Sequence, residues 1–68
     1  MIYKLFAIIY GDEVYIGHGT MQELKALAYQ QSYLLKYETG LAYINFYIQD
    51  DYKIIKEFRL WIEMRSHL

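Results

Sequence analysis

Apolar and polar residues repeat along this chain with two different periods. Residues 2–10 are mostly apolar on both alternating sets of positions, which is typical of a strand covered on both faces. Residues 41–49 alternate between apolar and polar positions, as in a strand with one buried face. Residues 20–38 instead repeat apolar positions at the spacing of an amphipathic α-helix. The pattern therefore predicts strands before and after one long helix.

A short second strand, residues 14–16, is expected directly after the first. Gly11 and Asp12 separate the two strands, and both residue types tolerate the backbone angles of a tight hairpin turn. Residues 17–20 then form the turn that leads into the helix. Such a glycine-containing turn before a helix can hold a phosphate, but this one lacks the lysine of a P-loop. We expect its glycines to serve the turn alone.

The helical segment has recognisable ends. Thr20 is a suitable N-cap, and Glu23, three residues later, completes a capping box. Gly40 stands where a left-handed residue commonly ends a helix. An alternative divides the segment near residues 29–31 into two short helices, as in a helix-turn-helix, although no glycine or proline stands there to make the turn. The apolar side expected to face the core consists of Met21, Leu24, Leu27, Ala28, Leu34 and Leu35.

Opposite this apolar side, tyrosines recur at every fourth residue of the helix. Their rings are expected to lie one above another along the axis, and tyrosine suits interfaces that are both apolar and wet. Two further tyrosines share the polar face of the strand at residues 41–49. The residues predicted to contact a partner are Tyr29, Tyr33, Tyr37, Tyr43, Tyr47 and Trp61. Packing of the tyrosines within one subunit, or in a homodimer contact, is the alternative.

The last segment, residues 52–68, fits both periods. Asp50 and Asp51 end the preceding strand, and either is able to cap a helix. As a strand, the segment would align Phe58 with other apolar residues, but Lys56 would interrupt that face. Its length and its Glu, Lys, Arg and Met content favour a helix. We therefore predict a single α+β domain over residues 1–68 in the order ββαβα, with ββαββ as the alternative.

Composition narrows the possible functions. The chain has 68 residues, no cysteine, one tryptophan, nine tyrosines and three phenylalanines. A chain this short cannot bury all of these rings, so some are exposed or covered by another molecule. The net charge of -1 argues against non-specific nucleic-acid binding. No apolar run is long enough to cross a bilayer, and no signal-peptide cleavage site follows the first residues. A cytoplasmic protein is expected.

Few residues suggest catalysis. His18 and His67 are the only histidines, and nothing in their spacing indicates a metal site. Ser32 and Ser66 are the only serines, and neither belongs to a nucleophile motif. A chain of this size also has little room for a substrate pocket. We therefore expect no enzymatic activity, no cofactor and no metal.

One resemblance to a known group of proteins emerges from the first half of the chain. It rests on the run at residues 10–13, on Ile16 and Gly17, and on Gly19 and Thr20 followed by Glu23 and Leu24. This pattern resembles small phage and prophage proteins of Gram-positive bacteria, in which a short hairpin runs through a Gly-Thr cap into a helix. The resemblance implies a protein that binds and inhibits a host protein, including host defence enzymes, in the host cytoplasm.

Two other functions are compatible with the sequence. In many of those phage proteins the helix continues as a helix-turn-helix-like element, but Tyr29 and Gln30 occupy the place of the turn glycine here. A small DNA-binding regulator would also need its basic residues gathered on one surface. A homo-oligomer would instead use the tyrosines between subunits. The basic residues concerned are Lys25, Lys36, Lys53, Lys56, Arg59 and Arg65.

Overall fold

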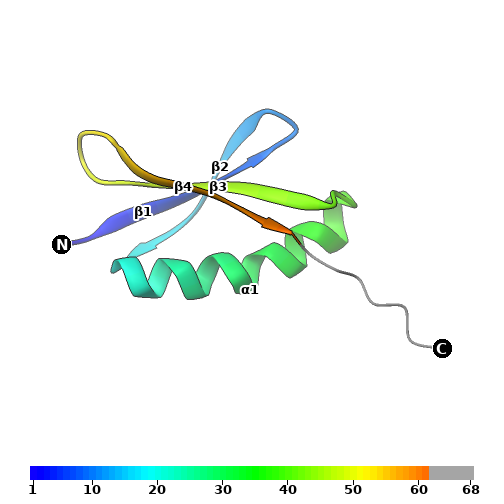
Figure 1. Ribbon diagram of the computed structural model, residues 1–68, viewed down its shortest axis with the longest axis horizontal. Coiled ribbons are helices and arrows are strands. Elements are labelled where there is room, and N and C mark those ends of the chain that lie inside the picture. The colour runs from blue at the N-terminus through cyan, green and yellow to red at the C-terminus, as the bar shows by residue number, and fades with distance from the viewer. Residues whose placement is uncertain (62–68) are drawn as a thin grey trace.

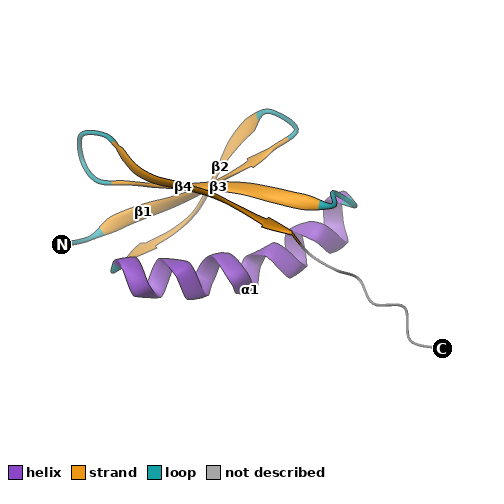
Figure 2. Cartoon of the chain, in the orientation of Figure 1, coloured by secondary structure: helices purple, strands orange, loops and turns teal. Residues whose placement is uncertain are grey.

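The computed structural model describes residues 1–61, and residues 62–68 lie outside the described part. The chain forms two layers, a four-stranded antiparallel sheet and one helix that covers one of its faces (Figures 1 and 2). The strand order in the sheet is β2-β1-β3-β4, so β2 and β4 are the edge strands. In chain order the elements are β1 (Tyr3–Ile9), β2 (Asp12–Gly19), α1 (Met21–Thr39), β3 (Tyr43–Gln49) and β4 (Ile54–Trp61).

The α+β class and the order of the first four elements are confirmed, but the predicted C-terminal helix is wrong over Ile54–Trp61. This segment is β4, and the alternative ββαββ order describes the chain. The reason is the pairing with β3, which places Phe58 opposite Phe46 and Leu60 opposite Ile44. Lys56 lies on the same face but stays exposed at the edge of the sheet. The rest of the predicted helix falls outside the described residues.

The first hairpin turns one residue earlier than predicted. Its two central residues are Tyr10 and Gly11, with φ angles of 51° and 84°, as in the type I′ turn that suits the twist of paired strands. Tyr10 is therefore a non-glycine residue in the left-handed region. Its hydroxyl donates a hydrogen bond of 2.7 Å to the carbonyl of Thr39. The turn is thereby fastened to the end of α1.

The predicted turn at residues 17–20 is wrong, because β2 continues through Gly19. Gly17 lies opposite Leu5 in the β1–β2 ladder. A Cβ atom on Gly17 would lie 2.7 Å from Cδ2 of Leu27. The glycine therefore allows α1 to approach the sheet closely, and the segment is not a phosphate-binding loop.

The ends of α1 are those expected from the sequence. Thr20 Oγ1 accepts a hydrogen bond of 3.2 Å from the backbone N–H of Glu23, whose side chain accepts one of 2.9 Å from the Thr20 N–H. Gly40 has a φ angle of 73°, and its N–H donates to the carbonyl of Lys36. The helix is continuous between these caps, so the division near residues 29–31 does not occur.

The buried face of α1 differs from the prediction at two positions. Leu34 is 55% exposed, whereas Ser32 is buried and its hydroxyl donates to the carbonyl of Tyr29. The reason is geometric, because Leu24, Ala28 and Ser32 lie at four-residue intervals along the buried side. Leu34 stands about a third of a turn from the centre of that side.

The core lies between α1 and the sheet. The alternation predicted for residues 41–49 is confirmed within β3, where Ile44, Phe46 and Ile48 are buried under the helix. It is wrong for Ala42, which precedes the strand and is exposed. The helix packs mainly against β1, β2 and β3, and β4 extends beyond its cover. Phe58 and Leu60 are therefore only partly buried. The fully buried cluster consists of Leu5, Ala7, Leu24, Ala28, Ile44, Phe46 and Ile48.

Candidate functional site

The helical tyrosines predicted as contact residues lie on the solvent side of α1. Tyr29 and Tyr33 are each 62% exposed, and Tyr37 is 84% exposed. We call these three residues the tyrosine stripe. They follow one another at four-residue intervals on a helix that is capped at both ends. The stripe is therefore a row of aromatic rings held on a rigid element.

The strand tyrosines lie on the opposite face of the sheet, so the structure separates them from the tyrosine stripe. This open face carries no helix among residues 1–61 (Figure 1). Phe6 stacks on Tyr47 with ring centroids 5.0 Å apart, and Tyr15 approaches Phe6 edge-on at 5.5 Å. Tyr47 is buried in this arrangement, at 6% exposure. It is a packing residue rather than part of an exposed contact surface.

The hydroxyl of Tyr47 has a specific partner in β2. It donates a hydrogen bond of 2.7 Å to Oε1 of Glu13. This bond, followed by burial, raises the pKa of the Tyr47 hydroxyl to about 12, because the neutral phenol is the form that donates to a carboxylate. The interaction joins β2 to β3 across β1.

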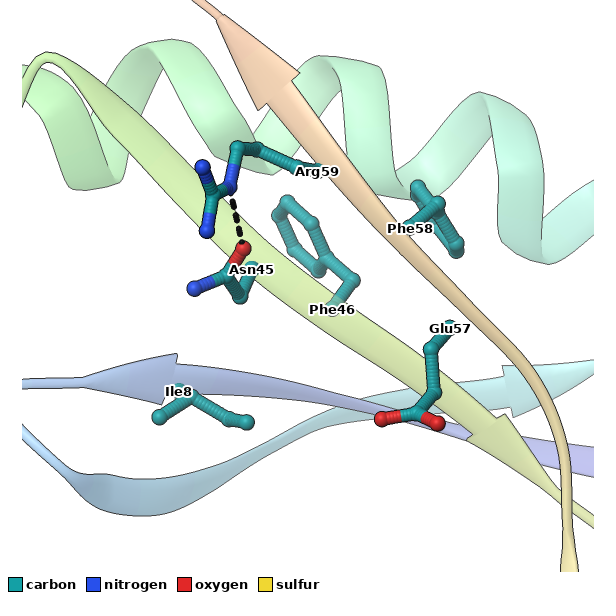
Figure 3. Close-up of a pocket in the computed structure, with 6 residues that line it drawn as sticks. All are labelled: Ile8, Asn45, Phe46, Glu57, Phe58 and Arg59. Atoms are coloured by element: carbon teal, nitrogen blue, oxygen red, sulfur yellow. Dashed lines mark hydrogen bonds between the residues drawn. The ribbon is translucent and has the colours of Figure 1, made fainter.

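Tyr43 and Trp61 lie together at the other side of the open face, around Arg59. The guanidinium carbon of Arg59 lies 4.0 Å from the centroid of the Tyr43 ring and 5.9 Å from that of the Trp61 ring. Nε of Arg59 donates a hydrogen bond of 2.8 Å to Oδ1 of Asn45 (Figure 3). We call Tyr43, Arg59 and Trp61 the Arg59 cluster. Its residue types are those that most often dominate binding energy at protein interfaces.

Sequence reasoning missed Arg59 as a member of this cluster. The arrangement results from the β3–β4 ladder, in which Tyr43 lies opposite Trp61 and Asn45 lies opposite Arg59. Arg59 and Trp61 are two residues apart, so they share one face only if the segment is a strand. The alternation of residues 57–61 indicates that Arg59 and Trp61 share a face. If the segment is taken as a helix, however, these two side chains lie on different faces.

A shallow hollow of about 380 Å³ lies on the open face between β1, β3 and β4. Figure 3 shows Glu57 and Arg59 of β4 on either side of Phe58, with Asn45 and Ile8 on the neighbouring strands. The hollow holds one acid and one base of opposite charge, and no nucleophilic side chain. Its residues are Ile8, Asn45, Phe46, Glu57, Phe58 and Arg59.

A second groove, of about 250 Å³, lies between α1 and β4, where the helix does not cover the sheet. Tyr29 of the tyrosine stripe lines it, together with Phe58 and Leu60 of β4. Arg59 lines both hollows, so β4 has a depression on each of its faces. The groove is completed by the basic residues Lys25 and Lys56.

Only part of the basic set that DNA binding would require comes together. Lys25, Lys56 and Arg59 meet at the groove. Lys36 lies in the last turn of α1, and Lys53 lies between β3 and β4. Arg65 is outside the described residues. Within residues 1–61, α1 is one continuous helix, and this part of the chain lacks the pair of helices that a helix-turn-helix requires.

The carboxyl groups of Glu23 and Asp50 serve the fold. Hydrogen bonds from the backbone and side chain of Thr20 lower the pKa of the Glu23 carboxyl. The backbone N–H groups of Tyr52 and then Lys53 lower the pKa of Asp50, which therefore shapes the β3–β4 turn rather than capping a helix. Among residues 1–61, no cluster of His, Cys, Asp and Glu side chains is suited to hold a metal ion. No helix in this part of the chain is long and apolar enough to cross a membrane.

Comparisons of the chain with models of protein families, with curated proteins and with solved structures give no match. Two surfaces of the protein are distinctive. One is the tyrosine stripe on α1, and the other is the edge strand β4 with the Arg59 cluster and the groove.

Proposed function

We propose that this protein is a non-enzymatic protein-binding module that contacts its partner through the tyrosine stripe. The observation that carries the proposal is the exposure of the three rings, 62%, 62% and 84%, on a helix whose other side is buried. A row of exposed aromatic rings on a small chain is typical of a contact surface. Tyrosine also loses little conformational entropy when it is immobilised at an interface.

The rigidity of α1 supports this proposal. The capping box at Thr20 and the left-handed Gly40 satisfy backbone groups at the two ends of the helix. The buried residues Leu24 and Ala28 fix its orientation on the sheet. A partner that contacts the stripe therefore meets side chains already placed on a fixed element, which reduces the entropic cost of binding.

The nature of the partner is proposed from the resemblance to small phage and prophage proteins. In that class, binding to a bacterial host protein inhibits it, and defence enzymes are among the targets. An inhibitor needs a contact surface but no catalytic residues.

Tyr33→Ala tests the proposal, because Tyr33 lies at the centre of the stripe. The full-length protein is immobilised, and host proteins are captured from a bacterial lysate. We expect Tyr33→Ala to weaken binding of the captured partner by roughly thirtyfold, which corresponds to the ~2 kcal/mol loss at a typical hot spot. The far-UV circular dichroism should not change, because alanine is a good helix former.

Tyr52→Ala is the matched control. Tyr52 is 94% exposed and lies in the β3–β4 turn, away from the stripe. This variant should capture the partner as well as the unmodified protein does. Equal capture by the Tyr33→Ala and unmodified proteins would contradict the proposal, as would capture that depends on Tyr52 instead.

A further inference from the structure

The edge strand β4 packs Phe58 and Leu60 against the core, but its outer edge serves neither the core nor the proposed function. Within residues 1–61 it is paired on one side only, by β3. An edge strand presents unpaired backbone N–H and C=O groups that can pair with another strand. On its helix-facing side, Phe58 and Leu60 are only partly buried and line the groove beside α1. This edge therefore offers both hydrogen-bonding groups and apolar surface.

We propose that the protein forms a homodimer in which β4 pairs antiparallel with β4 of a second copy, centred on Phe58. Charge complementarity points to a second copy as the occupant. In the single subunit Arg59 lies against Asn45 and Tyr43 of β3, so this pairing requires its side chain to turn toward the free edge. Glu57 and Arg59 flank Phe58 on the open face of the strand. In the centred register, Glu57 lies opposite Arg59 of the partner subunit, and the two-fold symmetry repeats the pair on the other side. Directly opposite residues in antiparallel strands point to the same face.

The neighbouring registers are electrostatically unfavourable. Moving the two-fold axis to Glu57 places Glu57 opposite its own copy, and moving it to Arg59 places Arg59 opposite its own copy. Like charges directly opposite each other destabilise strand pairing. A register shifted by one residue would set the open face of one subunit beside the helix-covered face of the other, which a two-fold axis perpendicular to the sheet does not allow. Of these registers, the one centred on Phe58 is therefore electrostatically favoured.

In the same register the strand of the second copy borders the groove. On the helix-facing side, Phe58 meets Phe58 of the partner subunit, and Leu60 meets the aliphatic stem of Lys56 of the partner subunit. The Lys56 ammonium remains in solvent at the seam, as long charged side chains commonly do. Pairing with the second copy thus adds apolar contacts at the flanks of Phe58 and Leu60.

Light scattering and analytical ultracentrifugation of charge-reversed variants test this dimer. The unmodified protein should dimerise as its concentration rises. Glu57→Arg and Arg59→Glu each place like charges across the seam, so each should weaken dimerisation by roughly tenfold or more. An equimolar mixture of the two variants restores opposite charges at both pairs. The mixture should therefore form a heterodimer whose affinity approaches that of the unmodified protein.

Glu38→Arg and Lys53→Glu are the matched controls. Both residues are exposed, and neither lies on β4. These variants should dimerise normally. A protein that stays monomeric at all concentrations overturns the proposal, and so does a dimer that both β4 variants leave intact. Failure of the mixture to associate, while each variant remains folded by circular dichroism, also overturns it. None of these results depends on partner capture, so the proposed function is judged separately.

Discussion

At the scale of single residues, Tyr47 differs from the other tyrosines because it is buried and its hydroxyl has a fixed partner in Glu13. The pKa of its hydroxyl is about 12 in the folded protein, against about 10 in an unfolded chain. The folded state therefore favours the neutral phenol. The contribution of the Tyr47–Glu13 hydrogen bond to the free energy of unfolding is complete below about pH 10. It is lost as the pH rises from about 10 to about 12.

Tyr47→Phe should remove this contribution while keeping the ring that stacks on Phe6. We expect the free energy of unfolding to fall by about 1 kcal/mol at neutral pH, since Glu13 is exposed and regains water. Urea titrations of both proteins between pH 8 and about pH 12 measure the difference. The difference should shrink above pH 10, and a constant difference would show that the hydrogen bond does not contribute as described.

At the scale of elements, Gly17 sets the distance between α1 and the sheet. An alanine there would bring Cβ to 2.7 Å from Cδ2 of Leu27, so one of the two must move. Gly17→Ala should therefore destabilise the protein by roughly 1–3 kcal/mol, as over-packed cores do. The reason can be checked in the Leu27→Ala background, where the obstructing methyl group is absent. In that background Gly17→Ala should lower the free energy of unfolding much less. An equal loss in both backgrounds would point to a backbone effect of Gly17 instead.

Of the elements of this fold, α1 was predictable from the sequence, whereas β4 was not. The limits of α1 depend on Thr20, Glu23 and Gly40, which act on backbone groups within a few residues, so they are readable from the sequence. The identity of β4 depends on Phe58 and Leu60 pairing with β3, a contact that sequence periodicity does not contain. The exposure of the tyrosine stripe was predictable from its position opposite the apolar side. The Arg59 cluster was not, because the β3–β4 ladder creates it.

At the scale of the whole molecule, the proposed dimer determines how the tyrosine stripes of the two subunits are arranged. The two-fold axis through Phe58 stands perpendicular to the sheet, so both helices lie on the same face of an extended sheet. Tyr29 lines the groove beside β4, so one residue of each stripe lies near the seam. A dimer of this form presents two equivalent contact surfaces in one direction.

This geometry predicts that dimerisation strengthens binding to a surface-bound partner. On a surface carrying many copies of the captured partner, the dimer can engage two copies at once, and its dissociation should be slower by a factor of roughly a hundred or more. Glu57→Arg, which is expected to be monomeric, should dissociate at the rate of a single contact. Toward the same partner free in solution at low concentration, the two proteins should show equal affinity per site, since Glu57 lies outside the stripe. Surface plasmon resonance measures dissociation from the surface, and calorimetry measures the affinity in solution. Slower dissociation of Glu57→Arg than of the unmodified protein would contradict the arrangement.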